Sequence, residues 1–182
     1  MSKKTETVSR RKFLKSSALA ATGAAAATVA APHIAKAATT LKVQAAWGGG
    51  IFLEEGALNM SGSKVSGNIS SEAYGFGGGI ACFDSSASIE DTEIRGNKTT
   101  GNESIGGGIA FDGGYGLDFS IINCLIVEND SLKRGGGISL YWHVDVEIQN
   151  STIANNSSGF GGGISSAYGC NATIKDSIIW SN

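Results

Sequence analysis

The sequence repeats with a period close to 29 residues, and this repeat constrains the fold more than any other feature. The tetrapeptide Gly-Gly-Gly-Ile occurs five times, at spacings of 29, 29, 29 and 26 residues. Its copies occupy residues 48–51, 77–80, 106–109, 135–138 and 161–164. Each copy is followed by a second pattern, apolar-x-apolar-x-[Gly/Asp/Asn]-[Ser/Thr/Cys]-x-[Val/Ile]-x-x-Asn. Two motifs that stay in phase over five copies indicate a solenoid in which each repeat forms one coil.

The spacing of apolar residues within a repeat is that of short β-strands. Apolar-x-apolar segments are separated by glycine and asparagine, and no stretch after residue 37 sustains a helical period of 3.6. The sequence therefore predicts an all-β chain that folds as a parallel β-helix. We expect about four to five coils over residues 48–182, preceded by a short lead-in at residues 38–47.

Equivalent positions of successive coils stack about 4.8 Å apart, so each position of the repeat becomes a row along the solenoid. Two aliphatic rows are expected to face inward: Ile51, Ile80, Ile109, Ile138, Ile164 and Val65, Ile94, Ile126, Ile153, Ile179. A third row is expected to form an amide ladder: Asn68, Asn97, Asn129, Asn156, Asn182. This ladder is expected at a corner, because Asn tolerates left-handed backbone. The triple glycines predict a second corner with positive φ or close backbone approach.

The two motifs resemble those of the right-handed parallel β-helix superfamily. They are similar to the glycine-rich repeats of polymorphic outer-membrane proteins and of exported proteins described as pectate-lyase-like. The resemblance covers residues 48–182 and implies the β-helix fold. It leaves the activity open, because that superfamily includes polysaccharide lyases and hydrolases as well as adhesins and surface spacers without catalytic function.

Residues 1–37 have the features of an export leader. The segment Ser-Arg-Arg-Lys-Phe-Leu-Lys around Arg10 and Arg11 matches the twin-arginine signal, and an alanine-rich stretch follows it. Small residues at Ala35 and Ala37 predict cleavage after Ala37. The leader implies export in a folded state, to the periplasm or the cell surface. No second apolar segment has the length of a membrane span, so no transmembrane segment is expected in the mature chain.

A second resemblance concerns residues 1–47, which are similar to the beginning of solute receptors of tripartite ATP-independent transporters. Those receptors continue into a large α/β domain, which the repeats of this chain do not resemble. The similarity implies a leader recombined from such a receptor, and no binding residue is transferred from it.

The charge of the sequence after the leader is strongly negative. The whole chain has 14 Lys and Arg and 16 Asp and Glu, of which 7 and 1 lie in the leader, so the remainder has 7 − 15 = −8. Nucleic acids and anionic membranes bind basic surfaces, so neither is an expected partner. An acidic protein also repels polyanionic glycans unless Ca²⁺ bridges the two.

The β-helix resemblance implies, for a pectate-type lyase, clustered acidic ligands for Ca²⁺ and an arginine base on one outer face. The only candidate cluster is Glu90, Asp91, Glu93 and Arg95. Lys64 and Lys98 are placed by the repeat where either one could pair with these acids, and such mixed charges are more typical of surface ion pairs. No metal site or other cofactor is expected, and Ca²⁺ enters only under this enzymatic alternative.

For a hydrolase of the polygalacturonase type, the resemblance implies aspartates in neighbouring coils together with a histidine. Asp84 and Asp112 differ by one position in the repeat and are not expected to align. His143 is the only histidine after the leader, which excludes a multi-histidine zinc site. We interpret it as a packing or loop residue.

Aromatic residues beside the glycine corners are candidates for stacking against a sugar. The candidates are Tyr115, Tyr141, Trp142 and Tyr168. The alternative is that these rings cover the glycine-rich bends, and both interpretations remain open.

Cys82, Cys124 and Cys170 occupy three different repeat positions, so their pairing is not predicted. Cys82 and Cys124 replace core and bend residues of other copies.

These observations favour an exported β-helix repeat protein that acts as a non-catalytic binding or surface-display module. The alternative is a carbohydrate-active β-helix enzyme, of lyase or hydrolase type, or a fragment of one. The expected partner is a glycan or a protein at the cell surface. The last copy ends at Asn182 behind the apolar segment 178–180. We therefore expect either a piece of a longer solenoid or end-to-end self-association.

Overall fold

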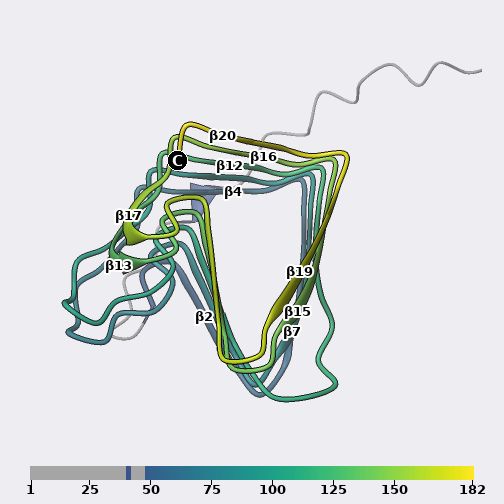
Figure 1. The fold of residues 1–182 in the computed structure, drawn as a ribbon, viewed down its shortest axis with the longest axis horizontal. Coiled ribbons are helices and arrows are strands. Elements are labelled where there is room, and N and C mark those ends of the chain that lie inside the picture. Colours follow the sequence, from purple (N-terminus) through teal and green to yellow (C-terminus); the bar gives the residue numbers. More distant parts are fainter. Residues whose placement is uncertain (1–39, 42–47) are drawn as a thin grey trace, which may run out of the picture. The chain divides into compact units, whose positions relative to one another are not determined.

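The computed structural model describes residues 40–41 and 48–182, and every regular element in them is a β-strand. From residue 48 onward the chain passes in turn through four sheets, which are lettered A to D and whose strands are given below. Each coil visits them in the order B, C, A, D. Each strand pairs in parallel with its equivalents in the neighbouring coils. Figure 1 shows the coils stacked behind one another, with sheets A, B and C as three sides. The predicted parallel β-helix is confirmed. The leader of residues 1–37, with Arg10, Arg11, Ala35 and Ala37, lies outside the described residues.

The four sheets are built from strands of two to five residues. Sheet A consists of β1 (Thr40–Leu41), β4 (Lys64–Ser66), β8 (Glu93–Arg95), β12 (Leu125–Val127), β16 (Thr152–Ala154) and β20 (Ile178–Trp180). Sheet B consists of β2 (Ile51–Glu54), β6 (Ile80–Phe83), β10 (Ile109–Asp112), β14 (Ile138–Tyr141) and β18 (Ile164–Ala167). Sheet C consists of β3 (Ala57–Ser61), β7 (Ser86–Glu90), β11 (Phe119–Ile122), β15 (Asp145–Gln149) and β19 (Asn171–Lys175). Sheet D consists of β5 (Ile69–Ser70), β9 (Lys98–Thr99), β13 (Asp130–Arg134) and β17 (Ser157–Phe160).

The core lies between the inner faces of sheets A, B and C. The two aliphatic rows face inward in register, and their central members are fully buried: Ile80, Ile109, Ile138, Ile94, Ile126 and Ile153. Burying one such side chain contributes roughly 1.5–3 kcal/mol to stability. The rows therefore stabilise the interior coils through contacts that every coil shares with its neighbours.

The asparagine row forms a continuous ladder of hydrogen bonds. Each side-chain amide donates to the Oδ1 of the next asparagine at 2.9–3.0 Å, from Asn68 through to Asn182. Each Oδ1 also accepts the backbone N–H of the asparagine before it. The expectation of left-handed backbone at these asparagines is wrong by one position, because positive φ occurs at the preceding residue: Gly67, Gly96, Glu128, Asn155 and Ser181.

The triple glycines allow the chain to approach its neighbours closely. Gly77, the first of its triplet, has a φ of 51°. A Cβ on Gly78 would lie 2.4 Å from the carbonyl oxygen of Gly107 in the next coil. A Cβ on Gly79 would lie 2.6 Å from that of Gly108. Both corner roles that the sequence allowed are therefore present, positive φ at the first glycine and close approach at the others.

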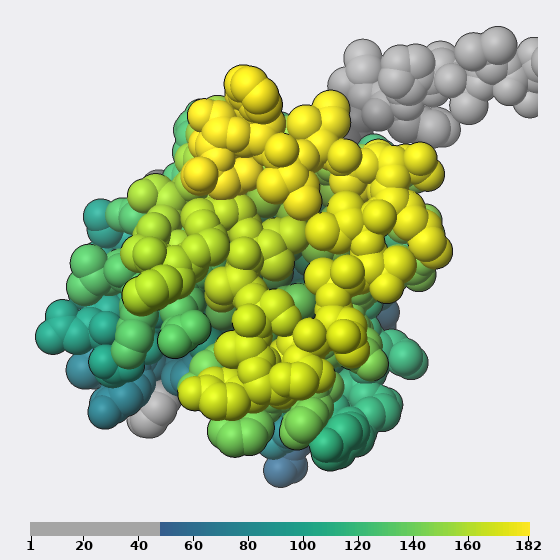
Figure 2. All heavy atoms as spheres, in the orientation of Figure 1, coloured from purple at the N-terminus to yellow at the C-terminus, as the bar shows by residue number. Residues whose placement is uncertain are grey.

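The last coil leaves apolar side chains uncovered. Ile178 and Trp180 of β20 are 62% and 71% exposed, and Ile179, the last member of an inward row, is 47% exposed. Figure 2 shows this coil spread over one end of the solenoid. In the described part of the chain no helix is long and apolar enough to cross a membrane.

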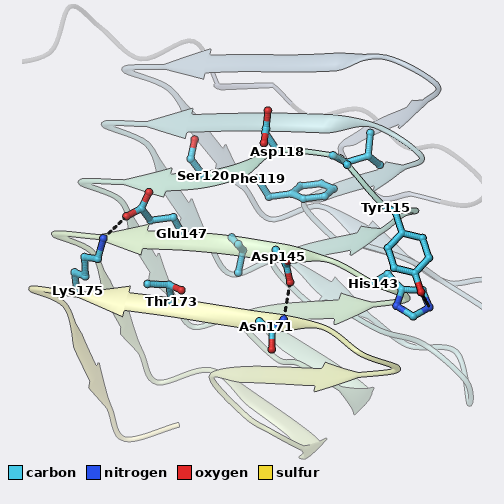
Figure 3. A pocket seen from close by; sticks show the side chains of 13 residues that line it. Tyr115, Asp118, Phe119, Ser120, His143, Asp145, Glu147, Asn171, Thr173 and Lys175 are labelled. Carbon is cyan, nitrogen blue, oxygen red and sulfur yellow. Dashed lines mark hydrogen bonds and ion pairs between the residues drawn. The ribbon is translucent and has the colours of Figure 1, made fainter.

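One corner differs in length between coils, and this difference shapes the outer surface. Sheets B and C are joined by two residues in the first two coils and by three in the last two. In the third coil six residues, 113–118, join β10 to β11. These six residues, here called the corner loop, stand beside the outer face of sheet C (Figure 3).

Candidate binding groove

The acidic cluster that the sequence singled out is divided by a corner of the solenoid. Glu90 ends β7 in sheet C, while Glu93 and Arg95 lie on β8 in sheet A. Asp91 lies between them with a φ of 47°. The four side chains therefore do not converge on one outer face.

On sheet A the charged residues form a row of ion pairs along the solenoid. Glu93 accepts contacts from Lys64 at 2.9 Å and from Arg95 at 2.6 Å, and Arg95 also contacts Glu128 at 2.5 Å. Hydrogen bonds from Arg95 and Lys64 lower the pKa of Glu93, and those to Glu128 and Glu93 raise the pKa of Arg95. Arg95 is thus held protonated, the opposite of what a general base requires. Of the two lysines that the repeat places near these acids, Lys64 pairs with Glu93, whereas Lys98 pairs with Asp130 at 2.7 Å.

A hollow with a volume of about 780 Å³ lies on the outer face of sheet C. We call it the sheet C groove. Its floor is formed by outward side chains of β11, β15 and β19, and the corner loop forms one side of it (Figure 3). The lining residues are Tyr115, Gly116, Leu117, Asp118, Phe119, Ser120, His143, Asp145, Val146, Glu147, Asn171, Thr173 and Lys175.

An aromatic pair stands at the end of the groove. Tyr115 is 82% exposed, and its ring stacks on His143 with centroids 4.2 Å apart and planes at 22°. The Tyr115 hydroxyl also lies 3.2 Å from His143 Nε2. Gly116 has a φ of 80°, which lets the corner loop turn directly after the tyrosine. His143 itself lies in left-handed backbone, with a φ of 55°. The ring of Tyr115 is thus supported on one side and accessible from solvent.

The floor of the groove consists of polar side chains at alternating strand positions. Asn171 donates a hydrogen bond to Asp145 at 2.8 Å, and Lys175 donates one to Glu147 at 2.6 Å (Figure 3). Ser120 and Thr173 align in register on either side of Glu147. The floor therefore offers both donors and acceptors over three coils.

The charge of the groove is negative. Its carboxylates are Asp118, Asp145 and Glu147, and Lys175 is its cation. Hydrogen bonds from Lys175 and from Gln149 lower the pKa of Glu147. A glycosidase acid needs a raised pKa, so Glu147 is unsuited to donate a proton near neutral pH.

Asp84 and Asp112 are offset by one position between neighbouring coils, as their places in the repeat predicted. Asp112 pairs in register with Phe83, and the backbone N–H of Asp84 donates to the carbonyl of Asp112 at 2.9 Å. Burial and the charge of Asp84 raise the pKa of Asp112 to about 6. Neither aspartate lines the sheet C groove, and His143 lies there without them. Among the described residues, no group of three or more His, Cys, Asp or Glu side chains is arranged to hold a metal ion.

The four aromatic candidates are divided between two places. Tyr115 belongs to the sheet C groove, whereas Tyr141, Trp142 and Tyr168 form a cluster of their own. Trp142 stacks on Tyr168 with centroids 4.6 Å apart and planes at 9°. Trp142 also lies 6.2 Å from the ring of His143, so aromatic contacts run around the corner between sheets B and C.

The three cysteines are free thiols. Cys82 and Cys124 are buried, which raises their pKa values to about 12 and about 11. Cys82 lies in a core row next to Phe111, as its repeat position indicated. Cys124 lies in the bend row between Thr92 and Ser151, also as indicated. Buried thiols of raised pKa are poor nucleophiles, so they add no catalytic group.

Sequence reasoning did not identify the groove, although one signal for it was present. The sequence predicts a packing or loop residue at His143. His143 does lie in the segment that joins β14 to β15, and its ring supports the exposed ring of Tyr115. The third repeat has 23 residues from its first glycine to its ladder asparagine, where the others have 20 or 21. The extra residues are in the corner loop. An insertion in a repeat maps to a loop on one face, which is often the binding face.

These observations define the class of the protein: it is a parallel β-helix with a groove on the outer face of one sheet. The comparison with protein families agrees: the model of the right-handed β-helix region matches residues 37–182. The chain therefore belongs to the right-handed β-helix family. The comparisons with curated proteins and with solved structures found no match.

Proposed function

We propose that this protein is an exported, non-catalytic binding module that holds a neutral glycan in the sheet C groove. The observation that carries the proposal is the exposed ring of Tyr115, supported by His143 at the end of an open groove with a polar floor. A sugar ring has one apolar face and a rim of hydroxyl groups. Such a ligand can stack on Tyr115 while its hydroxyls bind Ser120 and Thr173.

The charge of the groove supports a neutral ligand over a polyanionic one. With three carboxylates and one lysine among the lining residues, the local charge is 1 − 3 = −2. A polyuronate would be repelled unless a cation bridged it to the protein. Binding of a neutral glycan is expected to depend only slightly on salt, because it neutralises no charge.

Export through the twin-arginine route belongs to the same proposal. The leader around Arg10 and Arg11 supports it, and a groove that binds glycans suits a protein of the periplasm or cell surface. Changing both arginines to lysine is expected to leave folded precursor in the cytoplasm, as measured by fractionation. Normal export of that variant would remove the twin-arginine assignment.

Self-association remains a prediction of a different kind. The exposed apolar side chains of β20 support either alternative that the sequence left open, a further coil of a longer solenoid or end-to-end contact between copies, since an uncovered strand offers unpaired backbone groups. Light scattering at increasing concentration measures contact between copies, and a strictly monomeric protein would contradict the second alternative.

A glycan array followed by calorimetry on the best ligand tests the proposed function. Tyr115→Ala is expected to weaken binding about fivefold, because loss of a stacking ring costs on the order of 1 kcal/mol. Tyr74→Ala is the matched control, since Tyr74 is an exposed tyrosine outside the groove. Equal loss in the two variants, or no loss in either, would contradict the proposal.

A further inference from the structure

A second, smaller cavity of about 170 Å³ lies on the outer side of sheet B. One wall is formed by the residues that directly precede the triple glycines. Phe76, Ile105 and Arg134 hold this position in successive coils and are joined by parallel bridges. The facing wall carries Tyr141, at the end of β14, and Tyr168, directly after β18.

The Arg134 side chain distinguishes this cavity from the rest of the surface. Each of the other lysines and arginines in residues 48–182 has a carboxylate partner within 4.0 Å: Lys64, Arg95, Lys98, Lys133 and Lys175. Within those residues, Arg134 has no such partner. Its guanidinium carbon lies 5.5 Å from the centroid of the Phe160 ring, so the charge rests on an aromatic face. The nearby acid Glu103 is already paired with Lys133.

The remaining lining is aromatic and positions rings around the cation. Tyr74 is exposed at the rim, and Phe76 packs edge-on against Phe83 at 4.7 Å. Tyr141 and Tyr168 contact each other at 4.8 Å between centroids, also edge-on. Several flat rings beside one half-buried guanidinium fit a ligand that combines a ring with an anionic group.

We propose that this cavity binds a six-membered ring bearing one carboxylate, with Arg134 as the partner of the carboxylate and the tyrosines as partners of the ring. A carboxylate matches the planar guanidinium in a bidentate contact. The volume accommodates a single ring and not a chain of them. This site is separate from the sheet C groove, so the two proposals stand independently.

Two sources share that ligand chemistry, the uronic acids and the aromatic carboxylic acids. Galacturonate and 4-hydroxybenzoate represent them, with galactose and phenol as uncharged counterparts. Trp142 reports on binding by its fluorescence, because it stacks on Tyr168 at the cavity. We expect at least one of the two acids to bind, and its uncharged counterpart to bind tenfold or more weakly. The acid that binds identifies the source.

The matched variants are Arg134→Leu and Arg134→Lys. Leucine suits a row that already holds Phe76, Ile105 and Phe160, so the fold is expected to persist. Arg134→Leu is expected to weaken acid binding tenfold or more, and Arg134→Lys to restore part of it, since lysine keeps the charge without the planar fork. Tyr115→Ala should leave this binding unchanged. Four results would overturn the proposal: no binding of either acid, equal binding of acid and uncharged counterpart, unchanged binding by Arg134→Leu, or full competition by inorganic phosphate alone.

Discussion

The outer faces of sheets A and C are built from the same repeat and have different surfaces. Along sheet A the charges of Lys64, Glu93, Arg95 and Glu128 neutralise one another. On sheet C the corner loop adds a wall, and Tyr115 presents an open ring beside polar side chains. The difference between the two faces shows that a high density of charged side chains does not by itself indicate where the binding site lies. The candidate site forms where one coil departs from the repeat and leaves groups available to a ligand.

The largest effect is expected from a change that damages both faces at once. Ile94→Asp places a carboxylate in the shared core, where an unpaired charge costs several kcal/mol. Because each coil is stabilised by its neighbours, the adjacent coils should unfold together, and groove binding should disappear although Ile94 lies under sheet A. Circular dichroism and calorimetry measure the two losses. Ile94→Val is the control, expected to cost about 1 kcal/mol. Retained binding by the Ile94→Asp variant would show that the faces are independent.

The second effect is confined to sheet C. Replacing the corner loop, residues 113–118, by the two-residue corner Asp-Ser of the second coil removes the wall and Tyr115 together. We expect glycan affinity to fall more than tenfold while the strand signal in circular dichroism persists, because the register of β10 and β11 is set by their neighbours. Unchanged affinity would place the binding site elsewhere.

A smaller effect concerns pH and the corner at which the loop begins. The pKa of Asp112 is raised to about 6, so the folded state holds its proton more tightly than the unfolded chain does. Stability is therefore lost as pH rises from about 4 through 6, and the loss is complete above pH 6. Because Asp112 is half-exposed and solvent screens part of the effect, Asp112→Asn is expected to stabilise the protein by only about 1 kcal/mol at pH 7.5 and to have no effect at pH 4. Asp118→Asn serves as the control. Thermal unfolding of the variant and the unaltered protein at the two pH values measures this gain in stability. A gain at pH 4 equal to that at pH 7.5 would contradict the prediction.

The smallest effect is expected on sheet A. Arg95→Ala removes two partly exposed ion pairs, each worth about 0–1 kcal/mol and reduced by salt. Glycan binding should not change. We also expect no β-elimination of polygalacturonate by the unaltered protein, with or without Ca²⁺. Formation of unsaturated product that Arg95→Ala abolishes would favour the lyase alternative and reverse the comparison between the two faces.

The fold could be predicted from the sequence because a repeat multiplies its own signal. Five copies fix which residues stack, so the rows of Ile94 and Asn97 followed from counting alone. The groove could not be predicted in the same way. Tyr115 and His143 lie 28 residues apart, and their contact depends on a loop conformation that occurs in one coil only. Likewise, the sequence does not show that Arg134 has no ion-pair partner within residues 48–182. This becomes evident only once the positions of the acidic side chains are known.

A neutral glycan is proposed to bind on sheet C and not on sheet A. Mapping of NMR chemical-shift changes on the folded protein, titrated with the best neutral ligand of the array, tests it directly. We predict changes concentrated at Tyr115, Ser120 and Thr173, with the amides of Lys64 and Arg95 unaffected. Changes centred on sheet A, or spread evenly over both faces, would contradict the claim.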